Sequence, residues 1–315
     1  MEGRRHALHV GRVAALAILC GILCLSSAEP VIAHDRLRIV ATTNDLKSLA
    51  ELVGGDKVDV VSVVPANVDA EDYQPTPRDL SRLNQAKLVL RVGADYDLWM
   101  DRLIAQAKRP ELARGGSGYV DCSFAIALLD ARSTQVGPAG GHAHGSGNPH
   151  YWLDPRNAEI ITGTIFEALL RHDPDNAKYY ERRRLAFLNR LEQKITEWES
   201  KLATVPMKPM IAYHNNWAYF ARRFRLNFAG HIEVKPGIPP SPSHLARLLG
   251  VMRSLDIKII VRQPHEPTKD ADFLAGKTGA KIVLLAASVG AVKQAEDYLA
   301  LFDYNVATLL AAHQS

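Results

Sequence analysis

The chain is poor in cysteine. Only three of its 315 residues are cysteine, and Cys20 and Cys24 lie inside an apolar segment near the N-terminus. If that segment is removed, Cys122 stands alone and no intrachain disulfide can form. The segment itself, Val13–Leu25, spans 13 residues, whereas a membrane-spanning helix needs about 20. These shortages exclude an intrachain disulfide framework and a membrane span at this position.

The N-terminal segment has instead the layout of a secretory signal peptide. Arg4, Arg5 and Arg12 form a basic region before the apolar run, and small residues follow it, so cleavage is expected after Ala28 or Ala33. Neither cysteine of the run follows a small residue, which disfavours a lipid anchor. A signal peptide without disulfides fits a bacterial periplasm. We therefore expect an exported, soluble, periplasmic protein.

The charge balance is close to neutral. The formal net charge is +4 for the full chain, and the first 33 residues hold three Arg and two Glu, so the mature chain carries +3. No basic patch with interleaved aromatic residues is present, which excludes a nucleic-acid partner. The sequence also lacks a Ser/His/Asp arrangement, a phosphate-binding glycine loop and a His-Glu-x-x-His helix. We therefore predict a protein that is not an enzyme.

What is present is a regular alternation of strand and helix patterns in both halves of the chain. Apolar, β-branched runs bounded by turn residues alternate with helical periodicity, which predicts two α/β lobes with parallel sheets. Asn44 or Asp45 is expected to cap the first helix. The expected strands are 37–43, 58–64, 88–92, 210–213, 227–233, 258–261 and 281–285. The expected helices are 44–53, 78–86, 96–107, 155–171, 217–224, 243–255, 270–278 and 297–312.

A longer periodic segment separates the two halves. Leu185, Leu188, Leu191, Ile195, Trp198 and Leu202 recur at three- and four-residue steps on a charged background. This predicts one long backbone helix between the lobes. The expected division is a signal peptide over 1–33, an N-terminal lobe over 34–172 with a histidine-containing loop at 139–147, the helix over 173–205, and a C-terminal lobe over 206–315.

The stretch 140–155 carries the first candidate ligand. Its glycine-rich first half holds His142 and His144 and is too polar and small to pack, whereas its second half is stiffened by two prolines and anchored by aromatic side chains. His150 lies between them and is held in place rather than free. We interpret the loop as a tether that assists capture of a transition-metal ion by His150.

Three more candidates follow strands. Glu71, His214 and His265 lie in loops directly after expected strands, and parallel strands bring such loops to one sheet edge. Imidazoles with a carboxylate suit zinc, manganese or iron, and no thiolate is available. Each residue also has an ordinary reading: Glu71 as part of a solvated acidic loop, His150 as a histidine beside a buried turn, and His214 as part of a capped helix start.

With these motifs in order, the chain resembles the zinc/manganese solute-binding proteins of ABC importers, which have two α/β lobes joined by one long helix. Asp69-Ala70-Glu71-Asp72-Tyr73-Gln74-Pro75-Thr76-Pro77 is similar to the family's Asp-Pro-His-x-Tyr-Glu-Pro-Thr-Pro. Asn148–Pro155 and Tyr213–Phe220 resemble the second and third ligand motifs. The resemblance covers nearly the whole mature chain.

The sequence also departs from the family. Glu71 stands where the family has its first histidine, Gln263-Pro264 stands where members often have Glu-Pro, and 286–290 lacks the Asp that many members have. The resemblance thus implies His150 and His214 as ligands, with Glu71 as a substitute. The fourth position stays open between His265, which we favour, Glu266 and Glu233.

The resemblance implies a periplasmic binding protein that captures one divalent ion between its lobes and passes it to an ABC permease and its ATPase in the inner membrane. Zinc is the first choice and manganese the second, carried as transported ligand, with iron a further possibility, and we expect a monomer. Two alternatives remain from the residues alone: a zinc-dependent periplasmic hydrolase, and a metal chaperone without a transporter.

Overall fold

The structure, a computed structural model, describes residues 36–130, 147–204, 208–234 and 237–314. The expected signal peptide and the loop histidines His142 and His144 lie outside these residues. Both lobes belong to one unit that begins at Arg36. Within the described part, none of the helices combines the length and the apolar character that crossing a bilayer requires.

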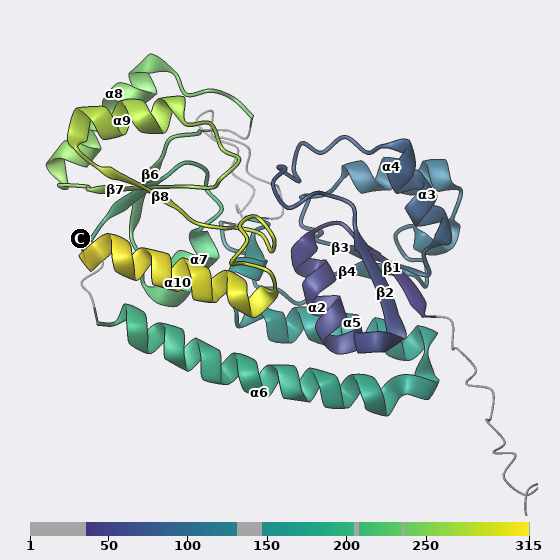
Figure 1. The fold of residues 1–315 in the computed structure, drawn as a ribbon. Coiled ribbons are helices and arrows are strands. Elements are labelled where there is room, and N and C mark those ends of the chain that lie inside the picture. The colour runs from purple at the N-terminus through teal and green to yellow at the C-terminus, as the bar shows by residue number, and fades with distance from the viewer. Residues whose placement is uncertain (1–35, 131–146, 205–207, 235–236, 315) are drawn as a thin grey trace, which may run out of the picture. The chain divides into compact units, whose positions relative to one another are not determined.

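The N-terminal lobe is built on a four-stranded parallel sheet in the order β2-β1-β3-β4 (Figure 1). The apolar residues of the two central strands are almost completely buried, as continuous apolar runs in a covered parallel sheet should be. The elements of this lobe are β1 (Leu37–Ala41), α2 (Asn44–Gly54), β2 (Val58–Ser62), α3 (Pro77–Gln85), β3 (Leu88–Arg91), α4 (Trp99–Ala107), β4 (Tyr119–Asp121) and α5 (Asn157–His172).

The C-terminal lobe repeats this plan with a second parallel sheet in the order β6-β5-β7-β8. In both sheets the strand order reverses beside the first strand of the lobe, and loops at such a switch point are where open α/β sheets hold ligands. The elements are β5 (Met210–Ala212), α7 (Ala218–Phe224), β6 (Phe228–His231), α8 (Pro242–Ser254), β7 (Ile259–Arg262), α9 (Lys269–Thr278), β8 (Lys281–Leu284) and α10 (Tyr298–Gln314).

One long helix, α6 (Ala177–Leu202), runs along both lobes (Figure 1). It has 26 residues, which corresponds to about 39 Å at 1.5 Å per residue. It packs against α2 and α5 of the N-terminal lobe and against α10. Its buried residues are Tyr180, Phe187, Leu191, Ile195, Trp198 and Leu202. Two parallel α/β lobes joined by one long helix confirm the predicted fold class.

Several local predictions were wrong. The helix expected from residue 96 begins at Trp99, because Gly93, Ala94 and Asp95 all have positive φ and form a tight turn first. The long helix begins at Ala177, after a short 3₁₀ turn over Pro174–Asn176. β4 was not expected, because three residues are too few to show a periodicity.

The cap of α2 was also predicted wrongly, and the correction matters for the junction between the lobes. The N-cap is Thr43, whose hydroxyl accepts a hydrogen bond from the Leu46 amide. Asp45 is therefore released to reach the other lobe. Its carboxylate accepts the Ser288 hydroxyl at 2.7 Å and the Val289 amide at 2.9 Å. We call these three residues the Asp45 clasp.

Two further hydrogen bonds join the same regions. The Trp152 indole donates to the carbonyl of Ala287 at 2.8 Å, and the Tyr298 hydroxyl donates to the carbonyl of Trp152 at 2.6 Å. The loop after β8 and the start of α10 are thus held against the N-terminal lobe by side chains that are buried themselves. This junction fixes the spacing of the sheet edges that carry the candidate ligands.

Candidate metal centre

Glu71 lies in the loop between β2 and α3, which is held on both sides of this residue. Directly before Glu71, the Trp99 indole donates to the carbonyl of Ala70 at 2.8 Å. At the end of the loop, Thr76 and Asp79 form a capping box at the start of α3. The Glu71 side chain is only 8% exposed. Glu71 is therefore part of a structured loop and not of a solvated acidic segment.

His150 is positioned by the residue two places before it. Asn148 accepts both the His150 backbone amide at 3.0 Å and the ring Nδ1 at 3.1 Å through its side-chain oxygen. Because an amide oxygen only accepts hydrogen bonds, Nδ1 is the donor in this contact, and Nε2 is the nitrogen that faces Glu71. The rings of Tyr96 and Trp152 pack against the imidazole at centroid distances of 5.4 and 5.3 Å. The ring is thus aimed by its surroundings.

His214 follows β5 and has a matching arrangement. Its Nδ1 lies 2.6 Å from a Glu233 oxygen, and the other Glu233 oxygen accepts the Gly237 amide at 2.8 Å. Burial lowers the pKa of His214, but the hydrogen bond to Glu233 and the charge of Glu71 outweigh it and raise this pKa to about 8. A carboxylate behind an imidazole is the usual support of a metal-binding histidine, because it fixes the ring and raises its basicity.

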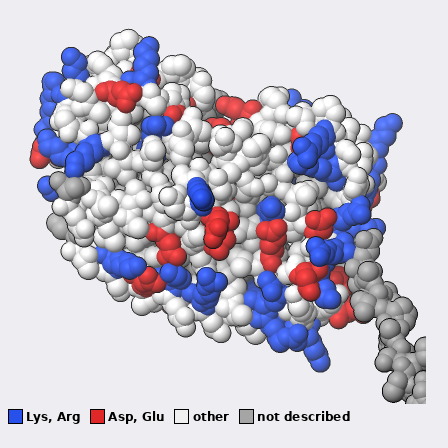
Figure 2. All heavy atoms as spheres, in the orientation of Figure 1, with Lys and Arg blue, Asp and Glu red and all other residues white. Residues whose placement is uncertain are grey.

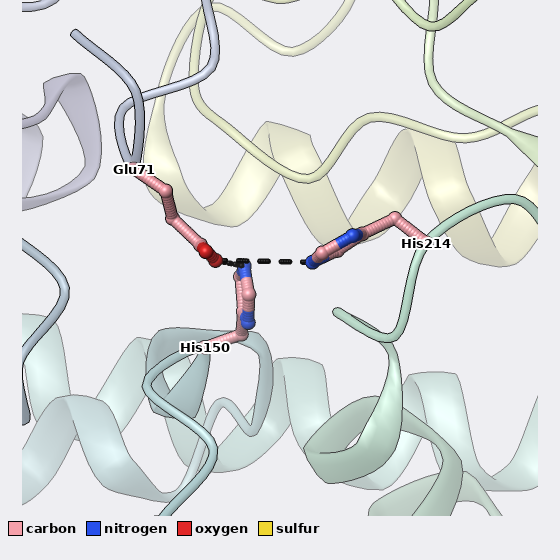
Figure 3. A group of neighbouring side chains, drawn as sticks. All are labelled: Glu71, His150 and His214. Carbon is pink, nitrogen blue, oxygen red and sulfur yellow. Dashed lines mark ion pairs between the residues drawn. The ribbon is translucent and has the colours of Figure 1, made fainter. Parts of the chain in front are cut away.

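The three side chains converge from three loops (Figure 3). The Glu71 Oε1 atom lies 3.4 Å from Nε2 of His150 and 3.8 Å from Nε2 of His214. One ligand atom from each residue lies within 4.8 Å of the other two. Two atoms that bind one zinc ion tetrahedrally at about 2.1 Å lie about 3.4 Å apart. The trio of Glu71, His150 and His214 therefore has the spacing of a metal centre.

The other candidates lie around this trio. His265 lines the same cavity but is exposed, and among the described residues no further His, Cys, Asp or Glu joins the trio at the same spacing. Glu233 is bound to His214 as described. Glu266 is held by the backbone amide and side-chain amide of Gln263, and its pKa is raised to about 7, chiefly by burial. The structure thus brings together three of the four residues that the sequence predicted.

The sequence analysis missed the two residues that support the histidines, Asn148 and Glu233. Only the role of Asn148 has a local signal in the sequence. Asn148 belongs to the Asn-Pro-His motif, and an Asn side chain commonly accepts the backbone amide two residues further on. Glu233 is separated from His214 by 19 residues, and only the pairing of β5 with β6 brings them together. No local pattern indicates that contact.

Comparisons with known proteins show the family of the chain. Residues 39–312 match the family described as "Zinc-uptake complex component A periplasmic". The chain is 28% identical to a "Putative metal-binding protein" of Treponema pallidum (87% of this chain, 86% of that protein) and 25% identical to the "High-affinity zinc uptake system protein ZnuA" of Bacillus subtilis (84% and 82%).

A solved structure has the same fold. The SBP FpvC from Pseudomonas aeruginosa in complex with Mn²⁺ superposes with a TM-score of 0.75 at 28% identity, over 89% of this chain and 99% of that one. The resemblance that the sequence motifs indicated is thereby confirmed. The chain belongs to the family of the periplasmic zinc-uptake complex component A.

Proposed function

We propose that the protein binds one divalent transition-metal ion, zinc first, through Glu71, His150 and His214, and delivers it to an ABC-type import permease. The observation that carries this is the convergence of the two Nε2 atoms and the Glu71 oxygen, with each Nδ1 engaged by an acceptor. Two nitrogens and one oxygen suit zinc better than manganese, which prefers more oxygen ligands. His265 is left outside the proposed ligand set.

The family membership makes the chain a metal-binding component of an uptake system, so its partners are the ion, a permease and an ATPase. We further propose that it works as a monomer in the periplasm, without catalysis of its own. On the face shown in Figure 2, Lys and Arg side chains are interspersed with Asp and Glu, and we propose no nucleic-acid partner for the protein.

The test is a zinc titration of the metal-free mature protein, with manganese as the competing ion. One tight zinc site per chain, with weaker manganese binding, supports the proposal. Tighter binding of manganese would overturn the choice of zinc, and no tight site for either ion would overturn the function. A panel of phosphatase and peptidase substrates, with and without zinc, tests the hydrolase alternative, because metal-dependent turnover would contradict a pure binding role.

A further inference from the structure

His150 and His214 line a cavity that is larger than a metal ion needs. Its volume is about 310 Å³, whereas one water molecule takes about 30 Å³ in the liquid. Pockets that hold small organic ligands begin at about 300 Å³. Residues of both lobes line it, among them Thr43 and Asp69 on one side and Asn216 and Gln263 on the other. The cavity therefore has room for a small molecule beside the ion.

The cavity is not a gap that would disappear if the two lobes moved closer together. The three ligand atoms already lie within 4.8 Å of one another. The Asp45 clasp and the bond from Trp152 to Ala287 already join the lobes at the cavity wall. Moving the lobes closer would compress contacts that are formed, so the space persists when an ion is held by the trio.

The trio supplies fewer ligands than zinc usually takes. Zinc in proteins usually has four ligands, and the described residues supply three at the required spacing. Asn216 lies in the cavity wall two residues after His214 and is 1% exposed. Its side-chain oxygen is buried without a hydrogen-bond donor among the described residues. A buried carbonyl without a donor is unfavourable, and a guest with an N–H group would remove that cost.

The charge of the wall indicates which guest fits. The described lining contains five carboxylate side chains and neither Lys nor Arg; the carboxylates are Asp45, Asp69, Asp72, Glu233 and Glu266. Such a wall repels an anionic chelator such as citrate. A zwitterionic amino acid with nitrogen ligands carries no net charge and offers N–H groups.

We propose that the trio takes its metal ion together with one free amino acid of the histidine type. That molecule, as the zwitterion, would bind the ion through a nitrogen of its neutral imidazole and donate an N–H of its ammonium group to the side-chain oxygen of Asn216. This inference rests on the proposed function, because the ion must first be held by Glu71, His150 and His214. It adds a second binding site, for the chelator, to the site for the metal.

The experiment uses the metal-free mature protein with zinc chloride and radiolabelled L-histidine in equilibrium dialysis. We expect zinc, histidine and protein in a 1:1:1 ratio, with histidine retained only when zinc is present and with citrate not retained. Zinc bound at 1:1 without retained histidine would overturn the proposal and leave the proposed function intact. A protein that binds no zinc, with or without histidine, would instead overturn the proposed function, and this inference with it.

A pair of variants tests the anchor. Asn216→Leu removes the carbonyl at similar volume and should weaken histidine retention at least tenfold, with folding checked by circular dichroism. The matched control is Asn215→Ala, because the neighbouring Asn215 side chain is exposed and does not line the cavity. Equal retention by wild type and folded Asn216→Leu would refute Asn216 as the anchor. Should Asn216→Leu not fold, the zinc-dependent retention by wild type still decides the proposal.

Discussion

Glu71 and Asp45 are both carboxylates of the N-terminal lobe that contact the C-terminal lobe, but their partners differ in kind. Asp45 meets a hydroxyl and a backbone amide, which are donors at any pH. Glu71 meets the Nε2 atoms of His150 and His214, which are donors only when protonated. The Asp45 clasp is therefore complete within the protein, whereas the trio gains from a cation between its members.

The comparison teaches that position at a sheet edge does not by itself make a ligand. Both carboxylates lie in loops or helix starts after a strand, and Asp45 lines the cavity that His150 and His214 also line. The two carboxylates differ in their partner atoms: Asp45 contacts a hydroxyl and a backbone amide, whereas Glu71 contacts imidazole nitrogens. The predictions below test this division, from the largest expected effect on zinc affinity to the smallest.

The largest effect is expected from His150→Ala, which removes a buried ligand of the trio. Loss of an outer partner of a ligand alone typically costs about 10–100-fold in metal affinity, so we expect a loss of at least about a hundredfold, and His214→Ala should behave alike. The control is His265→Ala, which changes a cavity residue outside the trio and should cost less than about threefold. Competition with a fluorescent zinc indicator measures all three, and comparable losses in all three would contradict the trio.

The affinity for zinc should fall strongly with acid. In the metal-free protein the pKa of His214 is about 8, so below that pH a proton occupies the atom that zinc requires. Each unit below pH 8 should then cost about tenfold from this residue alone, or about a hundredfold between pH 8 and pH 6. Titrations across this range with a pH-corrected competitor measure the slope. A constant affinity would place the His214 pKa below 6 or exclude His214 as a ligand.

Glu71→Gln should weaken zinc binding more than tenfold, because it keeps the shape of the side chain and removes the charge that faces both imidazoles. Asp69→Asn and Asp72→Asn are matched controls in the same loop and should do much less. Glu71→His should favour zinc further over manganese, since imidazole is the softer ligand. If Glu71→Gln binds zinc as wild type does, the distinction drawn above between Glu71 and Asp45 is wrong.

Asp45→Asn should change zinc affinity by less than about threefold but alter stability in a pH-dependent way. Burial raises the pKa of Asp45 from 3.8 to about 6, so folding favours the protonated form and stability is lost as the pH rises through 6. The asparagine does not titrate. The free energy of unfolding of Asp45→Asn minus that of wild type should therefore increase by up to about 3 kcal/mol from pH 4 to pH 7. Urea denaturation at both values measures this, and a constant difference would contradict it.

Deletion of 140–146 should have the smallest effect on the tight site, below about twofold, because no member of the trio belongs to this segment. The expected change is a slower uptake or the loss of a weak additional site supplied by His142 and His144. Stopped-flow and equilibrium titrations separate the two quantities. Complete loss of tight binding would show that the loop supplies a ligand and would enlarge the trio.

The sequence predicted most of the fold because its periodicities are local. In strands such as β1 and helices such as α6, the spacing of the apolar residues along the sequence is enough to predict the element. Only β4, the cap of α2 and several element ends were missed or misplaced. Asp45 illustrates the limit. An acidic residue at a helix start predicts a cap, and only the distance to Ser288, 243 residues away along the chain, shows another partner.

For the candidate site, the sequence indicated the three residues that lie together and one that does not join them. Strand ends and motif order indicated Glu71, His150 and His214, since parallel strands gather their loops at one edge. The fourth choice, His265, follows the same rule but lies outside the trio, because the position of a side chain within a loop depends on tertiary contacts. Glu233 shows this too, because its partner His214 is 19 residues away along the chain and no sequence pattern links the two.

Tyr219 has a consequence for how this protein can be altered. Its hydroxyl accepts the Leu129 amide at 2.9 Å and donates to the Asn148 carbonyl at 2.7 Å, and the Asn148 amide donates to the Leu129 carbonyl at 2.7 Å. The two ends of the chain around 130–147 are thereby joined at their base. Because loop closure costs grow only slowly with length, peptides of very different size could be grafted between these ends without moving His150. The base is a natural insertion point for a reporter or an affinity sequence next to the metal centre, because its own hydrogen bonds hold Asn148, the residue that positions His150.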